Sequence, residues 1–200
     1  MDALTILNLG CGRRRATADY QVQTYDGTGA PVEAALRWIH LDANPDVRPD
    51  VVCTLGVDPI PLADNSVNLA LAMHVLEHIG RQGEVGAWFQ FWTELYRVLT
   101  PGGRLQFECP HHTSVWAWAD PTHSRAISRE VFTYLNQDAY KVGGAIPDYR
   151  PPFDFVLAEW VLKPDTQNAH IRAVEGDTTY CAGTLVARKP LRPYWEIDHA

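Results

Sequence analysis

The stretch Leu7-Asn8-Leu9-Gly10-Cys11-Gly12 decides how this chain is expected to fold. An apolar run that ends in Gly-x-Gly indicates a buried strand followed by a tight turn, and glycine lets the backbone of such a turn approach a ligand closely. Alone, the pattern is equally typical of a strand-to-loop turn that binds nothing. The residues that follow must decide between these two interpretations.

The composition is that of a soluble globular protein. The 200 residues fit one domain, and a hydrophobic content of 46% allows a sizeable core. The net charge of −7 disfavours nucleic acid as a partner. No signal-like or membrane-spanning segment is found, so we expect a cytoplasmic protein without a membrane partner, and the oligomeric state stays open. The cysteines form no Cys-x-x-Cys pair, so neither a zinc knuckle nor a disulfide framework is expected; they are Cys11, Cys53, Cys109 and Cys181.

Short apolar runs that alternate with a helical pattern predict an α/β fold. A helix is expected between Glu84 and Leu99, and Pro101-Gly102-Gly103 ends it. Its apolar residues recur at steps of three and four and form one stripe, which comprises Val85, Trp88, Phe89, Trp92, Leu95, Tyr96 and Leu99. The expected parallel strands are Leu4–Leu9, Trp38–Asp42, Val51–Leu55, Val67–Met73 and Arg104–Cys109. The runs Phe153–Leu162 and Thr178–Ala187 predict a closing antiparallel hairpin. We therefore expect a mostly parallel sheet in a single domain of residues 1–200.

The loops after four of these strands are expected to meet in one crevice, because open α/β sheets bind ligands beyond the carboxyl ends of their strands. Gly10 and Asp42 follow the first two strands. Thr54 belongs to the third strand end, and Met73-His74 to the fourth.

In this order, the motifs resemble those of a compact subgroup of the class I S-adenosylmethionine-dependent methyltransferases. They are Asn8 to Gly12, Asp42, His-Val-Leu-Glu-His at His74 to His78, and Arg-Val-Leu-Thr-Pro-Gly-Gly at Arg97 to Gly103. The resemblance implies a Rossmann-like class I methyltransferase sheet with S-adenosylmethionine as cofactor. It implies that Gly10 and Gly12 contact the methionine part and that Asp42 accepts hydrogen bonds from both ribose hydroxyls. The cofactor residues it implies are Asn8, Gly10, Cys11, Gly12, Arg13, Asp42, Ala43, Thr54, Leu55, Met73 and His74.

Two features depart from the family pattern. Gly12 and Asp42 lie about 30 residues apart, more than the roughly 20 of a dinucleotide-binding unit, so we expect an insertion. Glycine and proline in Tyr25–Pro31 favour a turn, which predicts a short or displaced first helix, with room for a helical turn or two in Pro31–Arg37. Thr54 stands where family members often carry an acid, and its hydroxyl is the candidate for the adenine edge.

Two further motifs leave alternatives open. One of Arg13, Arg14 and Arg15 could pair with the cofactor's carboxylate, or the three could form a solvated basic turn. Helical spacing would place His74 and His78 on one face, as in a two-histidine metal site. Because the motif directly follows a buried strand, we expect no metal there, and the family resemblance implies that Leu76 and Glu77 are helix packing and capping residues.

Beyond the fifth strand lie the candidate catalytic residues. Methyl transfer to a hydroxyl or protonated amine requires removal of a proton, and imidazole suits that step near neutral pH. His111, His112 and His123 are the candidate bases, and Asp120 could orient one of them. Alternatively, Asp120-Pro121 starts a helix and the histidines satisfy backbone groups. Trp116 and Trp118 either wall an acceptor pocket or close the core.

The leading hypothesis is methyl transfer from S-adenosylmethionine to a small-molecule or glycan-like acceptor. An NAD-dependent oxidoreductase is less favoured, because its G-x-G-x-x-G pattern needs glycine where this chain has Arg15. A non-catalytic S-adenosylmethionine-binding or interaction module remains a third alternative, since fold alone does not establish turnover.

Overall fold

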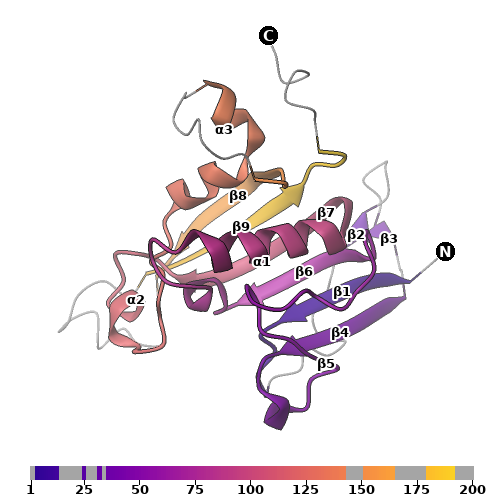
Figure 1. The fold of residues 1–200 in the computed structure, drawn as a ribbon, viewed down its shortest axis with the longest axis horizontal. Helices are drawn as coiled ribbons and strands as arrows, with labels where there is room; N and C mark the ends of the chain where they lie inside the picture. Colours follow the sequence, from indigo (N-terminus) through magenta and orange to yellow (C-terminus); the bar gives the residue numbers. More distant parts are fainter. Residues whose placement is uncertain are drawn as a thin grey trace.

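The computed structural model describes residues 3–13, 24–25, 31–32, 35–142, 151–164 and 179–191. Its main element is a seven-stranded sheet in the order β5-β4-β1-β6-β7-β9-β8 (Figure 1). The parallel strands are β1 (Leu4–Leu9), β4 (Leu36–Asp42), β5 (Val51–Val52), β6 (Val67–Met73) and β7 (Leu99–Pro110). β9 (Tyr180–Ala187) is antiparallel to both β7 and β8 (Phe155–Lys163). The predicted mostly parallel sheet with a C-terminal antiparallel hairpin is confirmed.

The strand order reverses at β1. After β1 the sheet is extended through β4 and β5 on one side, and the chain then crosses to β6 and β7 on the other. β1 is central and apolar, with Ile6, Leu7 and Leu9 almost fully buried, as expected for a strand covered by neighbours. Such a switch point leaves a crevice at the carboxyl ends of the strands, here those of β1 and β6.

The predicted amphipathic helix is α1 (Val85–Val98), which lies across the sheet in Figure 1. Trp88, Trp92 and Leu95 of the predicted stripe are buried, and so is Phe91, which the stripe omitted. Val85 was counted in the stripe but is 50% exposed, because it begins the helix beyond the packed region. The aromatic rings of α1 anchor the helix on the core, with Trp92 in edge contact with Phe155 of β8 at 5.4 Å between centroids.

Strand β7 begins at Leu99, five residues before the predicted Arg104, and two other predicted elements are absent or shortened. Pro31–Arg37 holds no helical turn in its described part, because Pro31–Val32 (β3) pairs antiparallel with Thr24–Tyr25 (β2) and β4 already begins at Leu36. The strand predicted at Val51–Leu55 ends at Val52, because the Thr54 N–H donates to the Asp58 side chain and the chain turns there.

The remaining described elements are short. They are the 3₁₀ helices η1 (Pro45–Val47), η2 (Leu76–His78) and η3 (Arg129–Leu135), and the α-helices α2 (Trp116–Ala119) and α3 (Gln137–Val142). Within the described ranges, no helix combines the length and the apolar character needed to cross a membrane.

Candidate cofactor and acceptor site

Asp42, at the end of β4, joins three strand ends. Its Oδ2 accepts a hydrogen bond from the Gly12 N–H at 2.8 Å, and its Oδ1 accepts one from the Asn44 N–H at 2.9 Å. Its backbone carbonyl accepts from the Cys53 N–H at 3.0 Å, beyond β5. A carboxylate oxygen has two lone pairs, so each oxygen can accept one more hydrogen bond. Asp42 is therefore fixed in place and can still receive two hydroxyl groups.

Gly10 and Gly12 both adopt left-handed backbone conformations, with φ of +56° and +53°. A Cβ at Gly10 would stand 2.8 Å from Val75 Cγ2, so glycine lets the loop after β1 contact the loop after β6. A Cβ at Gly12 would meet nothing within 4 Å. Gly12 thus presents bare backbone to open space directly beside the Asp42 carboxylate, which fits the passage of a ligand.

Other residues of the expected cofactor set lie around this point. Asn8 is buried within β1, where its Nδ2 lies 3.3 Å from His40 Nδ1. The Cys11 N–H donates to the Leu41 carbonyl, which ties the glycine loop to β4, and Ala43 is exposed beyond Asp42.

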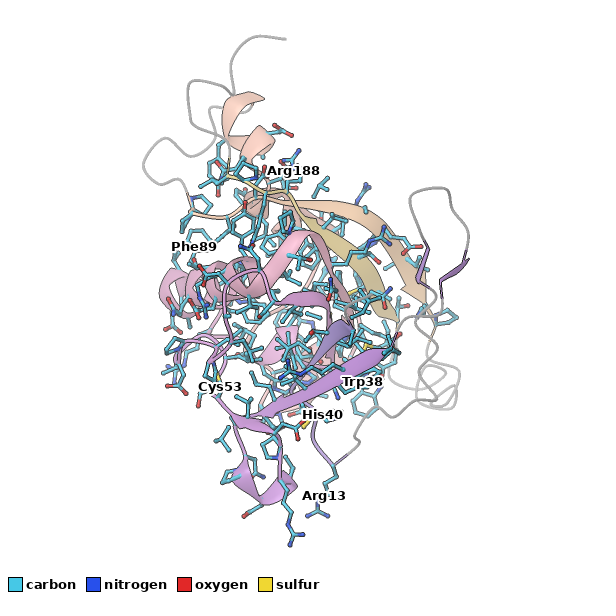
Figure 2. The ribbon with its side chains drawn as sticks, turned by 90° about the vertical axis from the view of Figure 1, so that its right-hand side faces the viewer. Arg13, Trp38, His40, Cys53, Phe89 and Arg188 are labelled. Atoms are coloured by element: carbon cyan, nitrogen blue, oxygen red, sulfur yellow. The ribbon has the colours of Figure 1, made fainter. Side chains whose placement is uncertain are left out.

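Arg13 is exposed, and its side chain points away from the sheet in Figure 2. Arg14 and Arg15 lie outside the described residues.

The turn after β5 contains an acid that the sequence analysis missed. Thr54 is exposed, and its N–H donates to Asp58 Oδ2 at 2.8 Å while its carbonyl accepts from the Asp58 N–H at 2.9 Å. Leu55 packs partly against the core. The Asp58 carboxylate therefore lies at the position expected to face adenine. The available signal was an acid four residues after Thr54 in a glycine-containing turn.

At the end of β6, Met73 is 38% exposed and His74 has a left-handed φ of +57°. The His74 N–H donates to the Glu108 carbonyl of β7 at 2.7 Å. Its ring meets the Tyr180 ring edge-on, with centroids 5.3 Å apart. Tyr180 had no local sequence signal, because only the pairing of β9 with β7 brings it here.

The His-Val-Leu-Glu-His motif is not a helix in the structure. Only Leu76–His78 forms a 3₁₀ turn (η2) with no side-chain cap, so His74 and His78 do not share a helical face and Glu77 is not a capping residue. The local cause is the left-handed backbone of His74, which stops a helix from starting there. Leu76 is fully buried, as its expected packing role requires.

Glu77 is the unusual member of this motif, because its carboxylate is 1% exposed. Neither oxygen has a hydrogen-bond partner among the described residues. Its Oε1 lies 3.3 Å from His74 Nδ1 and 3.9 Å from His123 Nε2. Interaction with Glu77 raises the pKa of His74, against the opposing effect of partial burial.

The four candidate catalytic residues fall into two groups. The His111 N–H donates to the Thr179 carbonyl at 3.0 Å, which places His111 beside β9, and the His112 ring lies 4.1 Å from that of His111. His123 and Asp120 lie together further along, with His123 Nε2 3.8 Å from Asp120 Oδ2.

The alternative of a helix starting at Asp120-Pro121 is wrong. α2 ends at Ala119, and Asp120 Oδ1 accepts hydrogen bonds from the N–H and the hydroxyl of Thr122, at 2.8 and 2.6 Å, in a side-chain-stabilised turn. These hydrogen bonds lower the pKa of Asp120. Trp118 is 70% exposed, and its Nε1–H donates to the His112 carbonyl.

A shallow cavity of about 220 Å³ adjoins Met73 on the β6-β7-β9-β8 side of the sheet. Its polar lining comprises Gln106, Glu108, Glu159, Lys163 and Thr184. Lys163 Nζ contacts Glu108 Oε2 at 2.8 Å, and the Thr184 hydroxyl donates to Glu159 Oε2 at 3.0 Å. The space beside β6 is therefore bordered by groups that can bind hydroxyls.

The chain is similar to one protein family and to several solved structures. The profile of the methyltransferase domain family matches residues 7–107. A SAM-dependent methyltransferase from Methanosarcina mazei has a TM-score of 0.57 at 12% identity, covering 94% of each chain. One from Archaeoglobus fulgidus has a TM-score of 0.52 at 15% identity, covering 93% of this chain and 86% of that one.

A third similar structure is the Burkholderia thailandensis 1,6-didemethyltoxoflavin-N1-methyltransferase, with bound 1,6-didemethyltoxoflavin and S-adenosylhomocysteine. Its TM-score is 0.53 at 14% identity, over 94% of this chain and 72% of that one. At such identities these likenesses show the fold. No curated protein sequence matches the chain significantly.

Proposed function

Because the chain belongs to the methyltransferase domain family, whose profile covers half of it, we propose that it methylates a small-molecule or glycan-like acceptor rich in hydroxyl groups. It is a class I methyltransferase enzyme, and S-adenosylmethionine is its cofactor. When bound, this cofactor supplies an electrophilic methyl group on a sulfonium. The chain's own residues must hold it, orient the acceptor and remove a proton.

The residues around Asp42 fit the adenosyl cofactor. The two free lone pairs of the Asp42 carboxylate suit the two ribose hydroxyls, and an ionised acceptor makes the stronger hydrogen bond. The space over Gly12 is open, so a ligand can approach the backbone there. Glycine at position 10 lets the loop after β1 lie close to Val75 in the loop after β6. Asp58 and Thr54 offer a carboxylate and a hydroxyl to the adenine edge.

The polar cavity beside Met73 is the observation that supports an acceptor rich in hydroxyl groups. Glu108, Glu159 and Lys163 line it with two carboxylates and an ammonium, which can accept from and donate to hydroxyl groups. A purely apolar acceptor would displace water from these groups and would not replace the hydrogen bonds that the water made. A polyhydroxylated molecule satisfies them while its reacting oxygen approaches the end of β6.

His111 and His112 are the proposed bases. They follow β7 directly, three and four residues after Glu108 of the cavity lining, and His111 is only partly exposed. One of them would take the hydroxyl proton as the acceptor oxygen bonds to the methyl carbon. His123 is less suited, because its Nδ1–H donates to the Trp116 carbonyl at 2.7 Å and its Nε2 faces the carboxylates of Glu77 and Asp120.

Formation of S-adenosylhomocysteine tests the proposal. The purified chain is incubated with S-adenosylmethionine and matched acceptors, each as a polyhydroxylated compound and as its deoxy or fully O-methylated analogue. We expect turnover with the hydroxylated members alone, and Glu159→Gln should raise KM for the acceptor without changing cofactor affinity. Binding of the cofactor without turnover in the whole panel would favour a non-catalytic module, and calorimetric binding of NAD instead would favour an oxidoreductase.

A further inference from the structure

A second cluster of chemically competent side chains lies apart from the glycine loop. Glu77 and His78 come from η2, and His123 comes from the segment after α2. Each offers a ligand atom, and these atoms lie within 4.8 Å of one another. Two imidazoles and a carboxylate are a donor set typical of zinc.

In both histidines Nδ1 makes a hydrogen bond, which leaves Nε2 available to bind a ligand. His123 Nδ1 lies 2.7 Å from the Trp116 carbonyl oxygen, and His78 Nδ1 lies 3.2 Å from the Thr122 carbonyl oxygen. A carbonyl only accepts, so both Nδ1 atoms carry the proton and both Nε2 atoms carry a lone pair. An Nδ1–H bound to a backbone carbonyl is the usual support of a metal-binding histidine.

The lone pair of His123 Nε2 faces two carboxylates. The distances are 3.9 Å to Glu77 Oε1 and 3.8 Å to Asp120 Oδ2. Both are too long for a hydrogen bond, so a proton on Nε2 does not bridge them. Two ligand atoms bonded to one tetrahedral ion at about 2.0–2.2 Å lie about 3.3–3.6 Å apart, so a contraction of a few tenths of an ångström would seat an ion between these groups.

The burial of the Glu77 carboxylate is a second observation that favours a cation at this site. It is 1% exposed, and neither of its oxygens has a hydrogen-bond partner within the described part of the chain. A buried carboxylate without such partners is strongly destabilised. The contacts of His74 Nδ1 at 3.3 Å and His123 Nε2 at 3.9 Å both lie on Oε1, and Oε2 is buried without a hydrogen-bond partner among the described residues.

The backbone around the cluster is already fixed. The Ser124 and Arg125 N–H groups both donate to the Glu77 carbonyl, at 2.9 and 3.1 Å. The Arg125 guanidinium, itself buried, donates to the Ile79, Arg81 and Glu84 carbonyls. Metal binding therefore requires small side-chain shifts and no ordering of a loop.

We propose that Glu77, His78 and His123 bind a divalent metal ion of the zinc class, with Asp120 Oδ2 as the fourth ligand. Asp120 Oδ1 is held by Thr122, which leaves Oδ2 directed at His123. The ion links η2 to the segment after α2. This site is independent of the proposed methyl transfer, because its four residues are assigned neither to the cofactor nor to the proposed base.

Metal content and Co²⁺ spectroscopy test the site without any measure of turnover. The full chain is stripped with a chelator, loaded with excess Zn²⁺, dialysed and analysed by mass spectrometry. We expect one Zn²⁺ per chain, and visible absorption of a four-coordinate Co²⁺ complex on titration with Co²⁺. His78→Ala, His123→Ala and Glu77→Gln should each weaken Zn²⁺ affinity at least tenfold, since each removes a ligand.

His112→Ala is the matched control, because it removes an exposed histidine outside the cluster and should keep full metal content. His78 is exposed, so His78→Ala keeps the test decisive if the buried variants fail to fold. Wild-type protein that retains no Zn²⁺ after dialysis overturns the proposal. So does a folded His78→Ala variant that binds Zn²⁺ as tightly as the wild type.

Discussion

Replacing Gly12 by alanine separates the binding role of the glycine loop from its role in folding. Gly12 has φ of +53°, and an added Cβ meets nothing within 4 Å. The substitution should therefore cost only the left-handed strain of a non-glycine residue, about 1–2 kcal/mol in the free energy of unfolding. The new methyl group would occupy the space beside Asp42 in which we propose that the cofactor binds.

Gly102 provides the matched control. It has φ of +73° in the turn near the start of β7, and its Cβ would also meet nothing within 4 Å. Gly102→Ala should lose the same stability as Gly12→Ala in urea denaturation. A steric conflict with bound ligand of about 1–3 kcal/mol corresponds to about 5- to 150-fold weaker binding for Gly12→Ala alone.

Isothermal titration with S-adenosylhomocysteine measures the difference between the two variants. Equal affinities for Gly12→Ala and Gly102→Ala would refute the placement of the cofactor over Gly12. Gly10→Ala tests the neighbouring contact, because its Cβ would lie 2.8 Å from Val75 Cγ2. It should destabilise the fold more than either of the other two variants.

Three other predictions concern the ligand, the base and the core. Asp42→Ala should weaken S-adenosylhomocysteine binding at least tenfold by calorimetry, because the ribose hydroxyls lose a charged acceptor; unchanged affinity would contradict the ribose placement. Of His111→Ala and His112→Ala, one should lose turnover in the S-adenosylhomocysteine assay and keep cofactor affinity; full activity in both excludes a histidine base there. Arg97 hydrogen-bonds Glu94 and lowers its pKa, so this pair stabilises the fold above about pH 4.5 and loses its effect as the pH falls further; Arg97→Met should lower the free energy of unfolding at pH 7 by about 2–4 kcal/mol and flatten its acid dependence in urea titrations.

Most of the sheet could be predicted from the sequence, because a buried parallel strand appears there as a short run of apolar residues. Leu4–Leu9 and Val67–Met73 match β1 and β6 in full. The prediction was less accurate where side chains decide the backbone, as at Thr54, whose bond to Asp58 ends β5 early. At Pro31–Val32 the sequence left room for a helical turn, but pairing with β2 forms a strand there instead.

The candidate site was predictable only in part. The convergence of Gly12 with Asp42 follows from the fold, because the carboxyl ends of parallel neighbours meet. The grouping of Glu77 with His123 does not, since it depends on how the segment after α2 packs against η2. The same holds for Tyr180, which reaches His74 through the antiparallel strand β9.

The pairing of β7 with β9 has a consequence for synthesis of the protein on the ribosome. Pro110 of β7 pairs with Tyr180 of β9, about 70 residues later in the chain. At 5–20 residues per second, one edge of β7 waits about 4–14 s for its partner strand to emerge. During translation the nascent chain therefore carries an unpaired strand edge, a state in which it is open to association with other chains and to capture by chaperones.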